Sequence, residues 1–149
     1  MSIIEYKRDD YNISTDKAKL DLNLIHNFLS QRSYWAQGRS LAIVEKSIEH
    51  SLCFGMYDRA GEQIGFARVV TDYATFAWLC DVFILETHRG QNLGKWLIEC
   101  IINYSDLQMP KRMLLATQDA HELYRRYGNF EELQNAERWM TRSPTDKTS

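Results

Sequence analysis

The spacing of apolar side chains predicts two helices in the first third of the chain. Between residues 21 and 31, and again from residue 41 onward, apolar positions recur every three or four residues, which is the spacing of one helical face. These positions are Leu24, Ile25, Phe28 and Leu29 in the first segment and Leu41, Val44 and Ile48 in the second. A short strand near Tyr11–Ser14 is expected before both helices.

From Leu52 onward the pattern becomes that of paired strands. The apolar runs LCFGMY and EQIGFARVV flank residues 58–61, DRAG, whose residue types tolerate the dihedral angles of a hairpin loop. The two runs therefore predict antiparallel strands. After a second connection at residues 72–75, Phe76–Ile84 predicts a third long strand.

The second half of the chain alternates helical and strand patterns. We expect a helix at Gly94–Tyr104, a short buried strand at Met113–Ala116 and a helix at Ala120–Tyr127, with last strands at Phe130–Leu133 and Arg138–Thr141. This order predicts a mixed α/β fold with a strand-loop-helix-strand unit in its second half.

Length and charge narrow the class of protein. A chain of 149 residues suits one compact domain, which we place at residues 1–142, followed by a polar tail at 143–149. With 18 basic and 20 acidic residues the net charge is −2, so the balance indicates neither a nucleic-acid partner nor a polybasic membrane contact. The first residues lack the apolar segment of a signal peptide, and no stretch approaches the roughly 20 apolar residues of a membrane span. We expect a soluble cytoplasmic protein.

The cysteines and histidines do not form a metal-binding pattern. The three cysteines lie in apolar segments without a close pair, which favours packed thiols, and the four histidines are scattered. They are Cys53, Cys80 and Cys100, and His26, His50, His88 and His121. We therefore predict no metal site.

Residues 89–95, RGQNLGK, connect the third long strand to a helix and have two interpretations. A flexible connection would need such residues, but the first turn of a helix also offers unpaired N–H groups and a positive dipole to an anion. Gly90 and Gly94 permit close approach, Asn92 adopts left-handed backbone cheaply, and Arg89 and Lys95 add positive charge. The spacing excludes the P-loop, and the dinucleotide motif GxGxxG is absent.

This stretch resembles the acetyl-CoA signature of the GNAT N-acetyltransferase superfamily, Arg/Gln-x-x-Gly-x-Gly/Ala. Arg89-Gly90-Gln91-Asn92-Leu93-Gly94 matches it, with Asn92 where the family usually has glycine. The lead-in at residues 84–90 keeps the family frame without its proline and tyrosine. Residues 120–128, AHELYRRYG, resemble the family's A-x-x-LY-x-x-x-G-F helix, with Asn129 inserted before Phe130. The resemblance covers roughly residues 52 to 130.

The resemblance implies the GNAT fold, a mixed central sheet of about six or seven strands, mostly antiparallel in its first half, flanked by about four helices. It also implies acetyl-CoA as co-substrate. The pantetheine arm would pair with main-chain groups of one strand, and the pyrophosphate would sit in the glycine loop. The implied contacts are Val82, Phe83 and Ile84 in the strand and Arg89, Gly90, Gln91, Asn92, Leu93, Gly94 and Lys95 in the loop.

Acetyl transfer requires a proton acceptor and a proton donor. A lysine-like amine, with a pKa of about 10.4, must lose a proton before attack, and Asp81 or Asp72 could take it directly or through water. Alternatively, Asp81 is a carboxylate satisfied by backbone donors and Asp72 a turn residue. In the family a tyrosine on the later helix protonates the leaving thiolate, and Tyr124 matches that position; otherwise it is a core phenol. Tyr127 is not required by the family pattern.

The acceptor-binding residues implied by the fold lie between the two early helices and on the sheet. They are Tyr34, Trp35, Arg39, Arg68 and Trp78. An aromatic wall with an arginine suits a small amine carrying a carboxylate, or a protein amino group, although exposed aromatics can equally be packing residues. A catalytically silent acyl-CoA sensor and a protein-interaction module without cofactor remain as alternatives, and a homodimer is a further possibility because dimers are frequent in the family.

Overall fold

The computed structural model describes residues 2–144, and within them six strands form one mixed sheet. The strands lie side by side in chain order: β1 (Glu5–Arg8), β2 (Tyr11–Ser14), β3 (Leu52–Tyr57), β4 (Gln63–Thr71), β5 (Ala77–Ile84) and β6 (Met113–Leu114). Neighbours from β1 to β5 are antiparallel, whereas β5 and β6 are parallel. The mixed sheet and its antiparallel first half, both predicted, are confirmed.

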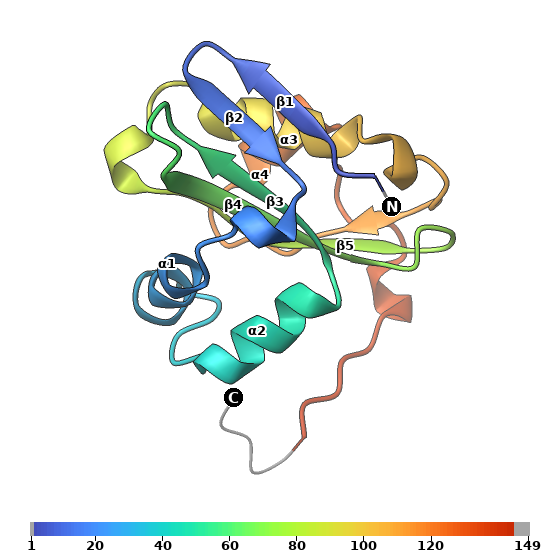
Figure 1. Ribbon diagram of the computed structural model, residues 1–149. Coiled ribbons are helices and arrows are strands. Elements are labelled where there is room, and N and C mark those ends of the chain that lie inside the picture. The colour runs from blue at the N-terminus through green and yellow to red at the C-terminus, as the bar shows by residue number, and fades with distance from the viewer. Residues whose placement is uncertain (1, 145–149) are drawn as a thin grey trace.

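Two helices cover each face of the sheet (Figure 1). α1 (Leu22–Asn27) continues into a π-helical turn at Phe28–Arg32 and packs with α2 (Leu41–Glu49) on one face; α3 (Leu93–Ile102) and α4 (His121–Gly128) lie on the other. The four helices agree with the prediction. None of the helices within residues 2–144 is long and apolar enough to cross a membrane.

Local sequence explains where the two early helices begin. The Asp21 carboxylate accepts a hydrogen bond from the Leu24 N–H, and the Ser40 hydroxyl accepts one from the Ile43 N–H. Both side chains satisfy an N–H group that the first helical turn leaves unpaired. Because strand side chains alternate between faces, Cys53 packs beneath α1 and α2, while its neighbours in β3 pack against α3.

The two strands predicted after α4 are wrong. Residues 131–144 are exposed, and the only regular element among them is a 3-10 turn at Ala136–Arg138. A strand needs a neighbour for its main-chain groups, and among the described residues β6 pairs only with β5. The predicted tail at 143–149 lies mostly outside the described residues, so the domain boundary after residue 142 stays a prediction.

Two other strand predictions need correction. β1 was missed because three of its four side chains, in EYKR, are charged and give no alternating apolar signal; its pairing with β2 supplies the missing reason for a strand. β6 ends at Leu114, although the prediction extended to Ala116, because residues beyond Leu114 have no ladder partner on β5.

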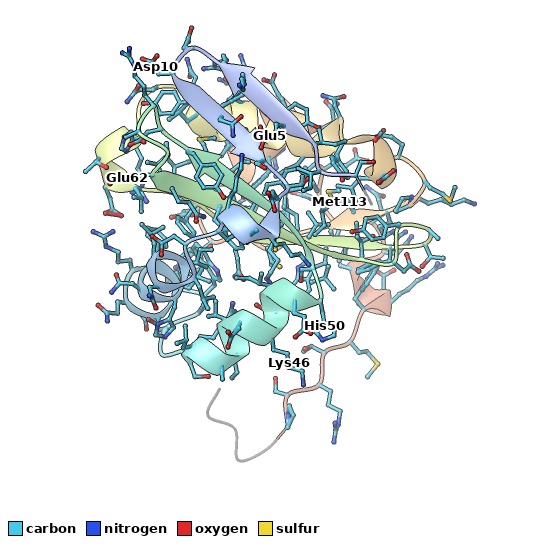
Figure 2. The ribbon with its side chains drawn as sticks, in the orientation of Figure 1. Glu5, Asp10, Lys46, His50, Glu62 and Met113 are labelled. Carbon is cyan, nitrogen blue, oxygen red and sulfur yellow. The ribbon has the colours of Figure 1, made fainter. Side chains whose placement is uncertain are left out.

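A bulge and a divergence distinguish β5 from the other strands. Phe66 pairs with Phe83 and Arg68 with Cys80, so two residues of β5 stand opposite the single residue between them in β4. On its other edge β5 pairs with β6 only at its first two residues, and the rest of that edge has no ladder partner within residues 2–144. Glu62 and Met113 mark opposite ends of the sheet in Figure 2. The gap that opens between β5 and the segment after β6 therefore lies toward the carboxyl end of β5.

Candidate active site

A cavity of about 260 Å³ lies where β5 and β6 diverge. It is lined by residues from β4 and β5, from the segment after β6, from α4 and from the connection between α1 and α2. The structure brings together all five predicted acceptor-binding residues and three other predicted site residues. These are Tyr34, Trp35, Arg39, Arg68, Trp78, Asp81, Val82 and Tyr124.

Asp81 is the buried centre of this site. It is only 4% exposed, and its Oδ1 accepts a hydrogen bond from Trp35 Nε1 at 2.8 Å. Its Oδ2 accepts from Arg39 at 2.9 Å and from Arg68 Nε at 2.8 Å. The alternative prediction for Asp81, a carboxylate satisfied by backbone donors, is corrected: its donors are three side chains, which compensate the carboxylate charge and occupy both oxygens.

The backbone at Asp81 adopts the left-handed region, with φ of 55°. Asp81 is one of the two bulge residues of β5, and aspartate is among the few side chains that visit this region at modest cost. Such a conformation persists when the surroundings over-determine it. The three donors to the Asp81 carboxylate supply that constraint, so the hydrogen-bond network stabilises the backbone of the bulge.

A tightly wound connection delivers Trp35 and Arg39 to Asp81. The Ser33 hydroxyl donates to the Leu29 carbonyl at 2.6 Å and accepts from the Ala36 N–H at 3.0 Å. The N–H of Gly38, whose φ is 75°, donates to the carbonyl of residue 30. These hydrogen bonds hold residues 33–39, SYWAQGR, in a fixed conformation, and three of these residues, Tyr34, Trp35 and Arg39, line the cavity.

Arg68 reaches the site from β4 and is held at both ends of its guanidinium. Its Nε contacts Asp81, and one terminal nitrogen donates to the Ser51 hydroxyl at 3.0 Å. Sequence reasoning missed Ser51, because a serine between a helix and a strand carries no signal that distinguishes it from a connection residue.

Asp72 lies away from this cavity. Its carboxylate closes the β4–β5 loop by accepting the N–H groups of Ala74 and Thr75, at 2.9 and 2.7 Å, and the Thr75 hydroxyl at 2.6 Å. The hydrogen bonds from Thr75, followed by that from Ala74, hold the pKa of Asp72 far below its usual range. Asp72 lines neither cavity described in this section, and its geometry is that of a turn residue.

Tyr124 lies in α4 and is 8% exposed. Its ring meets Phe130 edge to face, with centroids 5.8 Å apart, and its hydroxyl has no hydrogen-bond partner among residues 2–144. Burial, with a smaller contribution from Tyr34, raises the pKa of Tyr124 to about 12. Tyr127, one turn later, instead lies beneath the Lys95 amino group, which is 5.0 Å from its ring centroid.

The glycine loop leads from β5 into α3. Arg89 turns its side chain back to donate to the Ile84 carbonyl at 3.1 Å, and Gly90 has φ of 86°. Asn92 precedes α3 in left-handed conformation, with φ of 61°, and its side chain makes no capping hydrogen bond. The departure from the family glycine therefore keeps the backbone conformation that glycine serves, and it leaves the first-turn N–H groups of α3 without a side-chain partner.

The β1–β2 hairpin supports this loop, which the sequence did not indicate. The Tyr11 hydroxyl donates to Gln91 Oε1 at 3.2 Å, and the Arg8 guanidinium, 3.4 Å from the Gln91 carbonyl oxygen, lies over the Trp96 ring. The two contacts join residues 80 and 83 positions apart, so only the tertiary structure reveals them.

The other wall of the cavity follows β6. The Gln118 N–H donates to the Tyr34 hydroxyl at 2.5 Å, and the Ala120 N–H donates to the Thr117 hydroxyl at 3.1 Å. Asp119 lies between these two contacts and also lines the cavity. The sequence could have indicated this segment by its position after β6, because ligands of open α/β sheets bind beyond the carboxyl ends of parallel strands.

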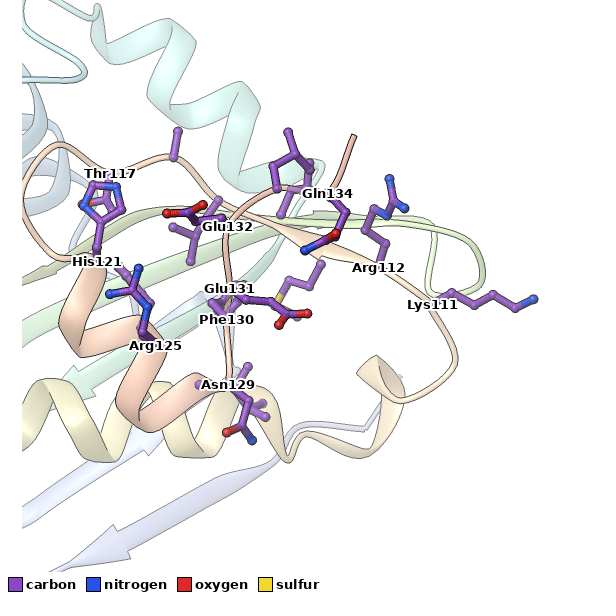
Figure 3. Close-up of a pocket in the computed structure, with 18 of the residues that line it drawn as sticks. Lys111, Arg112, Thr117, His121, Arg125, Asn129, Phe130, Glu131, Glu132 and Gln134 are labelled. Carbon is purple, nitrogen blue, oxygen red and sulfur yellow. The ribbon is translucent and has the colours of Figure 1, made fainter. Parts of the chain in front are cut away.

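A larger cavity of about 810 Å³ lies on the far side of the segment that follows β6. Figure 3 shows labelled side chains from four parts of the chain around it: Lys111 and Arg112 before β6, Thr117 after β6, His121 and Arg125 in α4, and residues between 129 and 134 beyond α4. The two cavities share Tyr124 and residues 115–117. The smaller cavity is the one that the buried network of Asp81, Arg39 and Arg68 lines.

Cysteine and metal chemistry receive no support from the geometry. The three cysteines are free, and burial raises the pKa of Cys80, which lines the smaller cavity, to about 11. Within residues 2–144, no three histidine, cysteine or acidic side chains gather closely enough to hold a metal ion.

Comparison with known proteins identifies the family. Residues 49–131 match the acetyltransferase (GNAT) domain family. A Gibberella zeae protein named as a candidate acetyltransferase is 32% identical over 139 residues, covering 80% of this chain and 78% of that protein. The crystal structure of a GNAT-family protein from Xanthomonas campestris pv. campestris has a TM-score of 0.87 at 46% identity, covering 93% of this chain and 96% of that one.

A more distant structure contains the co-substrate. The GNAT acetyltransferase of Elizabethkingia anophelis, solved with acetyl-CoA bound, has a TM-score of 0.57 at 13% identity, covering 77% of this chain and 70% of that one. The family match, the curated relative and the shared fold lead to one conclusion: this chain belongs to the GNAT family of acetyltransferases.

Proposed function

We propose that this protein transfers an acetyl group from acetyl-CoA to a primary amine by direct attack in a ternary complex. The observation that carries the proposal is the edge of β5 that has no ladder partner among residues 2–144: it runs from the glycine loop to a cavity lined by Tyr124, whose hydroxyl has no hydrogen-bond partner in the same residues. An extended pantetheine arm can hydrogen-bond to such an edge as an added strand does.

The glycine loop is the proposed pyrophosphate site. Uncapped N–H groups and the positive dipole of α3 favour an anion, and Arg89 and Lys95 add charge beside it. Gln91, Leu93 and Gly94 complete the loop, while Val82, Phe83 and Ile84 provide main-chain groups for the arm. Gly94 has open space where a Cβ would stand, so the backbone is accessible to a bound group.

The bulge at Asp81 is the proposed source of the oxyanion donor. A bulge residue leaves the ladder, so a main-chain N–H of β5 can polarise the thioester carbonyl instead of pairing with β4. We assign Asp81 a positioning role, because both of its oxygens are engaged by Trp35, Arg39 and Arg68. We assign Asp72 no role in the reaction, because its carboxylate closes the β4–β5 loop.

The proposed reaction releases one proton. The acceptor ammonium loses a proton to water, the neutral amine nitrogen forms a bond to the acetyl carbon, and the carbon–sulfur bond then breaks. Tyr124 donates its proton to the departing sulfur and regains one, through water, from the new amide nitrogen. Because the pKa of Tyr124 is raised to about 12, its hydroxyl is protonated throughout the neutral range and is always available as a donor.

The acceptor is proposed to be a small amine held against the aromatic wall of Tyr34, Trp35 and Trp78. Arg39 lines the same cavity and uses one hydrogen bond on Asp81, which leaves other donors for a carboxylate on the acceptor. A protein amino terminus is the second candidate, since Trp78 is 45% exposed and the wall is open to solvent there.

Thermal unfolding with and without millimolar acetyl-CoA tests the co-substrate site. A ligand that binds only the native state raises the melting temperature by mass action, and we expect a rise of several degrees. Arg89→Glu should abolish most of it. Lys46→Glu is the matched control, because Lys46 is exposed on α2 across the sheet and its reversal changes net charge equally.

Turnover separates the remaining alternatives. Thiol release on adding a panel of primary amines supports the transferase. A thermal shift without thiol release for any amine would support the catalytically silent acyl-CoA sensor, and the absence of any shift at saturating acetyl-CoA would leave the protein-interaction module.

A further inference from the structure

Two carboxylates line the smaller cavity, and they differ in what surrounds them. Asp81 is buried with both oxygens engaged by three donors. Asp119 is exposed and makes no hydrogen bond or ion pair with any residue in 2–144. A carboxylate that borders a cavity without a partner retains its full capacity to accept hydrogen bonds from a ligand.

The segment that carries Asp119 is held in place on both sides. Gln118 is tied to the Tyr34 hydroxyl, and Ala120 to the Thr117 hydroxyl. Asp119 stands one residue before the N-cap of α4, five positions ahead of Tyr124, and its negative charge contributes to the raised pKa of that tyrosine. Asp119 therefore lies near the proposed proton donor to sulfur, on a fixed rather than a frayed segment.

The charges of the cavity are distributed unevenly. Arg39, Arg68 and Asp81 form a cluster with net charge +1, which repels a cationic group. No oxygen of Asp119 lies within 4 Å of either guanidinium, because every such pair among the described residues would be an ion pair and none joins them. An acceptor that arrives as an ammonium is thus repelled by one wall and attracted to the other.

From these observations we propose that Asp119 binds the ammonium form of the acceptor amine and relays its proton to solvent before attack. The inference rests on the proposed transferase function and deepens it. In the step, one N–H bond of R–NH3+ breaks, its proton passes through the carboxylate or a bound water to bulk solvent, and the freed electron pair attacks the acetyl carbon. The aromatic wall receives the group R.

The test uses L-phenylalanine and 2-phenylethylamine as probe acceptors, with acetyl-CoA and a free-thiol assay. Both carry a primary amine and an aromatic ring, and only the first carries a carboxylate. Three variants are compared: Asp119→Asn, which removes the charge; Asp119→Glu, which restores it; and Glu122→Gln. Glu122 is a matched control because it is an exposed carboxylate of α4 that lines neither cavity.

At pH 7 we expect Asp119→Asn to raise the KM for whichever amine is turned over by about 10- to 100-fold, the range for loss of a charge-assisted hydrogen bond. The KM for acetyl-CoA and the acetyl-CoA thermal shift should stay at wild-type values. The increase in the amine KM of Asp119→Asn should become smaller as the pH approaches 10, where the free amine accumulates. Asp119→Glu should recover most of the loss, and Glu122→Gln should behave as wild type.

The outcomes that would overturn the inference are distinct from failure of the proposed function. If the wild type binds acetyl-CoA and acetylates a probe, an amine KM within twofold of wild type in Asp119→Asn refutes the role of Asp119. A loss that is equal at every pH, or that is shared by the KM for acetyl-CoA, also refutes it, because a structural effect would produce either pattern. If the wild type acetylates neither probe, the proposed function in its present form and this inference fail together.

Discussion

Replacement of Asp81 is the most demanding perturbation of the site, because this carboxylate joins the sheet bulge to the cavity wall. Asp81→Ala removes the partner of Arg68, which is itself buried, and the acceptor of the Trp35 indole N–H. It also places a non-glycine, nonpolar residue at φ of 55°. Asp81→Asn tolerates the left-handed backbone and keeps one side-chain oxygen, but it removes the charge and replaces the other acceptor oxygen with an NH2 group that faces a donor.

The size of the effect follows from burial. Removal of one partner of a buried ion pair costs about 3–5 kcal/mol, because the remaining charge stays desolvated. A left-handed alanine adds roughly 1 kcal/mol. Arg39 is partly exposed and can be rehydrated, which reduces the cost. We therefore expect Asp81→Ala to lose about 4 kcal/mol of unfolding free energy and Asp81→Asn about 2–3 kcal/mol.

Urea unfolding followed by circular dichroism measures these differences at constant m-value. For a domain of this size the alanine variant should melt roughly 8–16 °C below the wild type. Glu45→Gln on α2 provides the control, since Glu45 is exposed and has no ion pair among the described residues. The double variant Asp81→Asn/Arg68→Met should be more stable than the sum of the single losses predicts.

The reasoning would be refuted if both Asp81 variants unfolded within about 1 kcal/mol of the wild type, a margin typical of surface substitutions. It would also fail if Asp81→Ala kept wild-type kcat, because loss of the bulge should misplace the proposed oxyanion donor.

Two further variants test the proton donor and the loop. Tyr124→Phe should lower kcat by about 100-fold without changing the acetyl-CoA thermal shift. Burial raises the folded-state pKa of Tyr124 to about 12, above its unfolded value. Its contribution to stability is therefore complete below about pH 10 and is lost between pH 10 and 12. Unfolding experiments at different pH should show no such loss for the phenylalanine variant. Asn92→Gly should keep the acetyl-CoA thermal shift, whereas Asn92→Ala should lower the free energy of unfolding by about 1 kcal/mol and weaken the shift. Differential scanning fluorimetry measures both effects. Equal behaviour of the two variants would mean that the left-handed conformation at residue 92 is not required.

Local patterns in the sequence determined the elements that bury an apolar face. α1 and α2 follow from apolar side chains at helical spacing, and β3 and β4 from apolar runs around a hairpin loop, because these signals depend on near neighbours alone. The glycine loop was found for the same reason: glycine, asparagine and cations before a helix have local consequences for backbone conformation and charge. Where a strand depended on its partner, as at β1 and after α4, local pattern failed.

The tertiary structure alone decided which polar residues act together. Trp35, Arg39 and Arg68 were predicted to bind the acceptor, but they lie 46, 42 and 13 positions from Asp81 in the chain, and only the fold brings them together on it. Their convergence turns a candidate base into a buried, fully engaged carboxylate. The sequence did not separate Asp119 from other exposed acidic residues, because its significance lies in bordering the cavity without a partner. Periodicity reports burial along one element, whereas the protonation and reactivity of a side chain depend on the charges that the fold places around it.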